Sequence, residues 1–177
     1  MAFDSDAELV AAARAGSDAA FARLVARHQG VVRGFLGRVL NGDRAEADDV
    51  AQEVFLTAWT SLRSLNDAAG IRPWLCGIAW RKARDRMRGR RRAEARDAAW
   101  MDSRAPSPGV SPEDRMAMEA AMAALAPDER ACVALCLAEG WSHGEAAAAL
   151  GLPLGTVKSH VGRGRTKLLQ ALGGSDD

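Results

Sequence analysis

The feature that most constrains the fold is a pair of short helices encoded by residues 141–161. Ser142 and Glu145 have the S-x-x-E spacing of a capping box, which predicts that a helix begins there. Gly151 is a suitable residue to end that helix, and Pro153 suits the first turn of the next one. Two helices joined by a tight turn that contains glycine are typical of a helix-turn-helix.

The second helix of this pair combines an apolar stripe with a basic outer face. In a helix-turn-helix that binds DNA, the second helix enters the major groove, where some side chains read base edges while Arg and Lys contact phosphates. A basic helix can also be only the solvated face of a helical bundle, and the hairpin alone leaves that alternative open. The residues expected to face DNA are Thr156, Lys158, Ser159, His160, Arg163 and Arg165.

Apolar residues recur at helical spacing through the rest of the chain, and no stretch alternates apolar and polar residues over the length of a strand. We therefore expect an all-α protein. Residues 102–113 contain three prolines together with Ser and Gly, which is typical of a linker. This predicts two small helical domains, residues 1–94 and 112–177, joined by a flexible linker over residues 95–111. Helices are expected at about 6–15, 18–40, 45–62, 72–92, 112–125, 128–139, 142–150 and 154–171.

Charge is segregated along the chain, although its formal net charge is only +1. Acidic residues gather beside aromatic ones on the third expected helix. This pattern fits a docking surface for another protein, an acidic first turn favoured by the helix dipole, or a metal or acid–base site. No histidine and no loop cradle accompany the carboxylates, which disfavours the last reading. The residues of this acidic-aromatic helix are Asp48, Asp49, Gln52, Glu53, Phe55 and Trp59.

Basic residues gather on the fourth expected helix, beside Trp74 and Trp80. Arginine and aromatic side chains together suit a surface that stacks on unpaired bases and follows a phosphate backbone. The alternatives are a solvated helix end and arginines that neutralise the acidic cluster. The basic cluster comprises Arg81, Lys82, Arg84, Arg86, Arg88, Arg90, Arg91 and Arg92.

The sequence offers no ligand set for a metal or cofactor. Cys132 and Cys136 lie one helical turn apart without the further ligands of a zinc site, so we expect them and Cys76 to pack in the core. There is no glycine-rich phosphate loop or nucleophile triad, so neither an enzyme nor a small-molecule substrate is expected.

The compartment can also be predicted. Three cysteines without a disulfide framework fit a reducing environment. The acidic N-terminus does not resemble a signal peptide, and no apolar run is long enough to span a bilayer. We therefore expect a cytoplasmic protein.

Three segments together resemble the extracytoplasmic-function (ECF, group IV) class of bacterial sigma factors, in the sigma-70 superfamily. They are residues 48–59, residues 74–79 with the Arg-rich helix that follows, and residues 125–130 leading to residues 155–159. The resemblance covers nearly the whole chain in the same order. It implies a promoter-specificity subunit of bacterial RNA polymerase that directs transcription initiation.

The resemblance also implies what each half does. The first domain would bind core RNA polymerase through the acidic-aromatic helix, and would recognise and melt the −10 promoter element. The second would read the −35 element, with the linker threaded into the core enzyme. Members of this class are usually held inactive by an anti-sigma factor, often anchored in the inner membrane, so such a partner and tether are expected. The residues expected at the −10 element are Asn66, Trp74, Arg81, Lys82, Arg84 and Arg88.

The chain departs from the family pattern at several positions. Ile71 stands where the family often has Phe, and Trp80-Arg81 where it often has Arg-Asn. In the last helix, many relatives have Arg at the position of His160 and Ala at that of Gly164.

Two other classes of protein remain as alternatives. Residues 155–161 also resemble the DNA-reading helix of LuxR-like transcriptional regulators, and a two-domain regulator of that kind would act without binding polymerase. An enzyme that uses Asp48 and Asp49 with a metal is the third class, and the sequence shows no ligand set for it.

Overall fold

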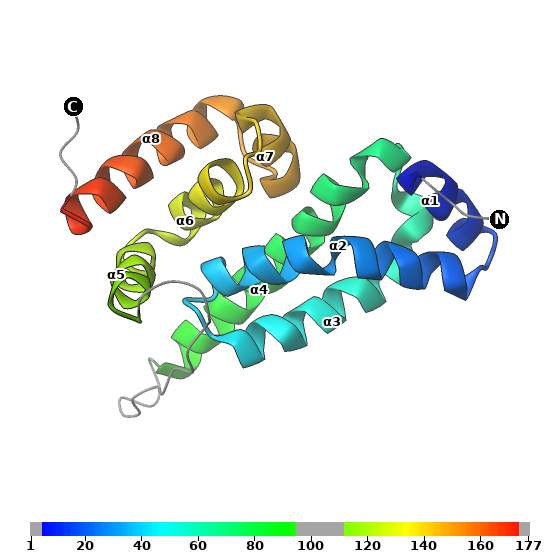
Figure 1. Cartoon of the computed structure of the whole chain (residues 1–177), viewed down its shortest axis with the longest axis horizontal. Coiled ribbons are helices and arrows are strands. Elements are labelled where there is room, and N and C mark those ends of the chain that lie inside the picture. The colour runs from blue at the N-terminus through cyan, green and yellow to red at the C-terminus, as the bar shows by residue number, and fades with distance from the viewer. Residues whose placement is uncertain (1–4, 95–111, 174–177) are drawn as a thin grey trace.

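The computed structural model describes residues 5–94 and 112–173, and in this part of the chain it contains helices and no strand (Figure 1). The all-α prediction is confirmed, while the linker expected at residues 95–111 lies outside the described residues. Two short 3-10 turns, Leu62–Ser64 and Ala68–Gly70, lead into the fourth α-helix. The α-helices are α1 (Asp6–Arg14), α2 (Asp18–Val39), α3 (Arg44–Ser61), α4 (Ile71–Glu94), α5 (Pro112–Ala123), α6 (Pro127–Val133), α7 (His143–Leu150) and α8 (Leu154–Ala171).

Side-chain caps set the starts of several helices. The capping box predicted for α7 is present: Ser142 accepts a hydrogen bond from the backbone N–H of Glu145, whose carboxylate accepts one from the N–H of Ser142. At α3 the cap is a single hydrogen bond, which the Asp43 carboxylate accepts from the backbone N–H of Glu46 at 2.9 Å. Gly151 ends α7 with a φ of 66°, a left-handed conformation that glycine adopts without strain.

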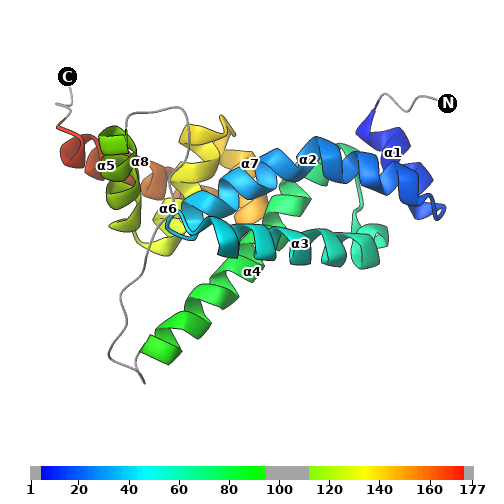
Figure 2. The same cartoon turned by 60° about the horizontal axis from the view of Figure 1, so that its bottom comes forward.

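The first half of the chain packs α2, α3 and α4 around a shared apolar core, with α1 against one end of α2. Phe35, Val50 and Val54 are fully buried in this core. Trp80 is only 2% exposed, so its ring belongs to the core and the prediction that it helps form a stacking surface is wrong. The last turns of α4 extend away from the other helices (Figure 2).

The second half is built around α8, which packs mainly on α6 and also contacts α5 and α7. A π-helical turn, Ala134–Ala138, continues α6, so the helix expected at 128–139 is present with an irregular end. Val157 and Val161 of α8 point into this core. The polar residues of α8 therefore remain on its outer side.

The two halves are docked together, most closely where α7 meets α4. A Cβ atom added at Gly77 of α4 would lie 2.9 Å from the backbone carbonyl oxygen of Ala149, near the end of α7. Real Cβ atoms essentially never come this close to a backbone oxygen. The contact between α4 and α7 therefore requires glycine at position 77.

A cluster of charges around Glu139 forms a second contact between the halves. Its carboxylate accepts a hydrogen bond from Arg38 of α2 at 2.7 Å and lies 3.8 Å from the Arg72 guanidinium of α4. The same guanidinium lies 4.9 Å from the centroid of the Trp141 ring, within the range of a cation–π interaction. Residues from three distant parts of the sequence therefore hold the halves together.

Arg130 forms a third contact, and it is buried. Within the second half its guanidinium donates to the backbone carbonyls of Met122 at 2.8 Å and Leu125 at 2.9 Å. Across the interface it donates to the carbonyl of Val39 at 3.1 Å and to the side chain of Asn41. Arg130 thus supplies donors to the C-terminal ends of α5 and α2, where helix carbonyls lack partners within the helix.

We predict that Gly77→Ala separates the two halves, because the new methyl group would collide with the carbonyl of Ala149. The radius of gyration measured by small-angle X-ray scattering should increase. The matched control is Gly30→Ala on α2, where an added Cβ meets nothing within 4 Å. That variant should stay docked and gain about 0.5–1 kcal/mol of stability from helix propensity. Equal radii of gyration for the two variants would contradict the prediction.

Candidate functional site

The predicted DNA-reading helix presents its polar residues outward, as the helix-turn-helix pattern requires. Lys158, Ser159, Arg163 and Arg165 are exposed, while Thr156 and His160 are half-buried at its edge. All six therefore lie on one helix and are at least partly accessible to solvent, although Arg163 also contacts Glu129 of α6.

Gly164 explains how closely α8 approaches α6. A Cβ atom at this position would lie 2.5 Å from Cγ2 of Val133. Val133 therefore occupies the space that a methyl group at position 164 would need. Gly164 accordingly lies on the buried side of α8.

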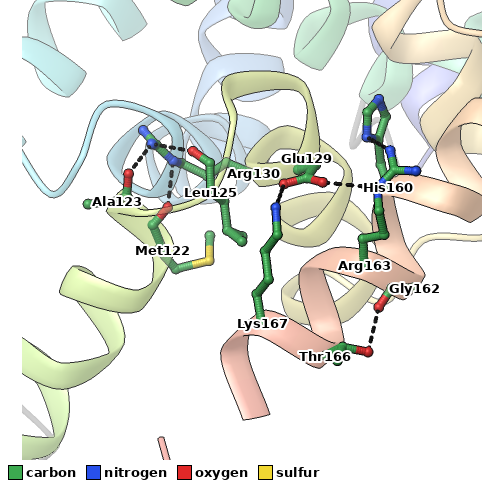
Figure 3. A network of polar contacts seen from close by, with 10 residues as sticks. All are labelled: Met122, Ala123, Leu125, Glu129, Arg130, His160, Gly162, Arg163, Thr166 and Lys167. Atoms are coloured by element: carbon green, nitrogen blue, oxygen red, sulfur yellow. Dashed lines mark hydrogen bonds and ion pairs between the residues drawn. The ribbon is translucent and has the colours of Figure 1, made fainter. Parts of the chain in front are cut away.

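A buried carboxylate lies behind the outer face of α8, and sequence reasoning missed it. Glu129 of α6 is 4% exposed and accepts hydrogen bonds from Nε of Arg163 at 3.2 Å and from Nζ of Lys167 at 2.7 Å (Figure 3). Burial raises the pKa of the Glu129 carboxyl, but the hydrogen bonds from Lys167 and Arg163 outweigh it, so its pKa lies below the ordinary value of 4.5. Nothing in the local sequence distinguishes Glu129 from its solvated neighbours.

The basic cluster of α4 divides into paired and outward-facing residues. Lys82 and Arg86 form ion pairs with Glu53 of α3, and Arg90 pairs with Glu46. The alternative in which arginines neutralise the acidic cluster therefore holds for these three basic residues. Arg81 and Arg84 are exposed, and Arg88 pairs with Asp85 on its own helix.

The remaining residues expected at the −10 element lie on both sides of the 3-10 turn that precedes α4. Asn66 is exposed in the loop, whereas Trp74 is half-buried against the core on the first turn of α4. Trp74 is therefore partly accessible, whereas Trp80 is almost entirely buried.

The acidic-aromatic helix forms one side of a shallow groove between α2 and α3, with a volume of about 390 Å³. Asp49 and Gln52 are exposed, Phe55 is half-buried, and Trp59 packs on Phe21 with ring centroids 4.8 Å apart. Leu56 lines the groove and is 68% exposed, a large apolar residue in water that sequence reasoning missed. A leucine on the polar side of an amphipathic helix was the sequence signal that could have predicted this exposed apolar residue.

The cysteines behave as packing residues. Burial raises the pKa of both the Cys76 and the Cys132 thiols to about 12, which keeps them protonated and unreactive. Among the described residues, no group of three or more His, Cys, Asp or Glu side chains is placed to hold a metal ion. In the same part of the chain, no helix is both long and apolar enough to cross a membrane.

Comparison with known proteins agrees with this geometry. The family model for Sigma-70 region 2 matches residues 24–93, and that for Sigma-70, region 4 matches residues 115–168. The chain is 36% identical to the RNA polymerase sigma factor CarQ of Myxococcus xanthus, over 90% of this chain and 93% of CarQ. It is 33% identical to the ECF RNA polymerase sigma factor SigM of Mycobacterium tuberculosis, over 96% of this chain and 85% of SigM.

The chain belongs to the ECF class of sigma-70 family sigma factors. It is thus a promoter-specificity subunit that binds core RNA polymerase and directs transcription initiation. The LuxR-like alternative is not supported, because the first half of this sigma factor matches region 2.

Two solved structures resemble this sigma factor across both of its halves. One is the sigma factor RpoE in complex with the anti-sigma factor NepR from Bartonella quintana, with a TM-score of 0.76 and 26% identity over 86% of this chain and 96% of RpoE. The other is CnrH in complex with the cytosolic domain of CnrY, with a TM-score of 0.72 and 33% identity over 96% of this chain and 98% of CnrH. The docked arrangement of the halves therefore resembles that of sigma factors in such complexes.

We predict that Gly164→Ala destabilises the sigma factor by about 1–3 kcal/mol, because the methyl group would overpack against Val133. Denaturant unfolding measures the effect. Val133→Ala provides room for the methyl group, so the double variant should be more stable than the sum of the single effects predicts. Helix propensity by itself favours Ala over Gly, so a gain in stability in Gly164→Ala would show that Val133 leaves room for the methyl group.

We predict that the stability contributed by the Glu129 carboxylate is lost in acid. Because its pKa is lowered by folding, the contribution is complete above the unfolded value of 4.5 and disappears as the pH falls through the folded value. The difference in unfolding free energy between wild type and Glu129→Gln, which cannot ionise, should therefore shrink below pH 4.5. A difference that stays constant with pH would mean that the two ion pairs contribute no stability.

Proposed function

We propose that residues 1–94 bind core RNA polymerase and open the −10 element, that residues 112–177 read the −35 element, and that residues 95–111 connect them through the core enzyme. The observation that carries this assignment is α8, whose apolar side packs on α6 while Lys158, Ser159, Arg163 and Arg165 remain exposed. This is the disposition that a major-groove helix requires.

The polymerase-binding surface is the groove between α2 and α3, with the exposed residues that border it. Its apolar part is Leu56 with Phe55 and Trp59, and Gln52 lines the groove beside them. Asp49 is exposed three residues before Gln52 on α3, so a polar rim borders an apolar centre, the usual anatomy of a protein interface. Glu53 has a different part, because its carboxylate is bound to Lys82 and Arg86 and so holds α4 on α3. Asp48 is paired with Arg33 of α2 at 3.1 Å.

The −10 surface consists of the exposed basic residues Arg81 and Arg84, with Trp74 and Asn66 beside the start of α4. Unstacked bases of an opened strand can lie on an aromatic ring while arginines follow the phosphates. Lys82 and Arg88 contribute charge to this surface while held by Glu53 and Asp85.

The docked halves must separate for both promoter elements to be read. Elements at about −35 and about −10 are about 25 base pairs apart, or about 85 Å of duplex at about 3.4 Å per base pair. A folded chain of this length has a radius of gyration of about 16 Å. In the docked arrangement α4 contacts α7, the helix next to α8, so the two reading surfaces are far too close together.

An anti-sigma factor would hold the docked arrangement. A groove of about 880 Å³ runs between the halves, with apolar lining from Met118, Leu137 and Leu172 and a basic rim that includes Arg44 and Arg165. An amphipathic helix with acidic flanks fits such a groove. We propose that the sigma factor acts in the cytoplasm without enzymatic activity, cofactor or small-molecule substrate, and that a membrane-anchored anti-sigma factor tethers it at the inner membrane.

We predict that Asp49→Lys weakens binding to bacterial core RNA polymerase by about tenfold. A polymerase surface that is complementary to the Asp49 carboxylate would repel the positive charge of the lysine. Size-exclusion binding or a fluorescence titration with purified core enzyme measures the affinity. Asp49 is exposed, so thermal unfolding should be unchanged.

The control for this test is Asp18→Lys, the same charge reversal at an exposed position outside the groove, at the start of α2. It should bind polymerase like the wild type. If both variants bind with wild-type affinity, the acidic rim of α3 takes no part in docking. If the wild-type chain forms no complex with the core enzyme, the proposal as a whole fails.

A further inference from the structure

The carboxylate of Glu129 reaches two of the basic residues on the DNA-reading helix, one with each oxygen. Oε1 accepts from Nε of Arg163 and Oε2 accepts from Nζ of Lys167, both from inside the second half. The Glu129 side chain is 6% exposed, whereas those of Arg163 and Lys167 are 57% and 51% exposed. The buried anion therefore holds the inner edge of two side chains whose outer edges face solvent (Figure 3).

The contact extends along one stripe of α8. Thr156, His160, Arg163 and Lys167 follow one another at spacings of three or four residues, which places them on the same face of the helix. Nη2 of Arg163 also lies 3.0 Å from Nδ1 of His160. The Lys167, Glu129, Arg163 and His160 side chains thus form one connected network.

Arg163 and Lys167 keep free donors for a ligand within this network. An arginine has five N–H donors and a protonated lysine has three, and Glu129 takes one from each. The remaining donors belong to side chains that are already ordered, and ordered side chains lose less entropy on binding. Glu129 therefore directs these residues without using up their capacity to bind DNA.

We propose that Glu129 is a positioning residue that sets how well this sigma factor discriminates its −35 sequence from other DNA. This inference rests on the proposed role of α8. Holding Arg163 and Lys167 in one geometry favours contacts that need a fixed direction, which are the contacts that carry sequence information. The negative charge also offsets part of the attraction to phosphates, which is independent of sequence. Both effects increase the preference of the sigma factor for its −35 sequence over other DNA.

The test compares the wild type with Glu129→Gln, which keeps the shape of the side chain and removes its charge. Each protein is assembled with bacterial core RNA polymerase. One probe is a duplex enriched by the wild-type holoenzyme from a pool with a randomised −35 segment, and the other carries the same bases of that segment in scrambled order. The Kd values for both duplexes are measured at one salt concentration, because phosphate contacts make each affinity depend on salt.

The discrimination ratio is the Kd for the scrambled duplex divided by the Kd for the enriched duplex. This ratio should fall about tenfold in Glu129→Gln, which is the discrimination that one good directional contact supplies. Binding to the scrambled duplex should be unchanged or tighter. The matched control is Asp128→Asn, the same change of charge one residue earlier on α6, which should keep the wild-type ratio. An unchanged ratio in Glu129→Gln would overturn the proposal and leave the residue with a structural role only.

A double variant tests whether Glu129 acts through Arg163. Arg163→Ala should lower the ratio, and adding Glu129→Gln should then cause little further loss; additive losses would contradict a positioning role. If Glu129→Gln fails to fold, Arg163→Lys keeps the charge and loses the paired geometry, so its ratio should fall, and an unchanged ratio overturns the proposal. If neither Arg163→Ala nor Lys167→Ala alters binding to either duplex, the −35 assignment of α8 itself is wrong.

Discussion

The hydrogen bonds of the Arg130 guanidinium hold the second half together and also dock it to the first half. A buried charge is costly unless it is fully hydrogen-bonded, and Arg130 meets this condition with the carbonyls of Met122, Leu125 and Val39. These carbonyls lie at or just beyond the C-terminal ends of α5 and α2, where a cation is favoured by the helix dipoles. One side chain therefore closes the turn between α5 and α6 and fixes the end of α2 against them.

Two neighbouring residues give α6 its central position. Glu129 points toward α8 and Arg130 toward α2, so a helix of seven residues connects the DNA-reading helix to the first half. Both side chains are buried ionic groups whose partners lie in other elements. Such groups are sensitive to the placement of their partners, because an unpaired buried charge is strongly unfavourable. The position of α8 thus depends on its ion pairs with Glu129 of α6 as well as on the packing of its apolar stripe.

Much of the fold could be predicted because it depends on local signals. The caps at Ser142 and Gly151 and the apolar periodicity fixed the helices to within a few residues. Contacts between distant segments carry no such signal: Arg38 and Glu139 are 101 residues apart, and the pairing of Glu53 with Lys82 and Arg86 depends on how α4 crosses α3. Trp80 was misread for the same reason, since an aromatic residue among arginines is buried once other helices cover that side of α4.

The contact at Gly77 bears on how quickly the halves can part. It joins a residue without a side chain to a main-chain carbonyl, so no side chain is inserted into the opposing surface at this point. A displacement of about 0.5–1 Å already removes about a quarter to a half of such van der Waals attraction. No rotamer has to change before the helices separate there. Resistance to separation must therefore come from the apolar core that both halves share and from the polar contacts around Glu139 and Arg130.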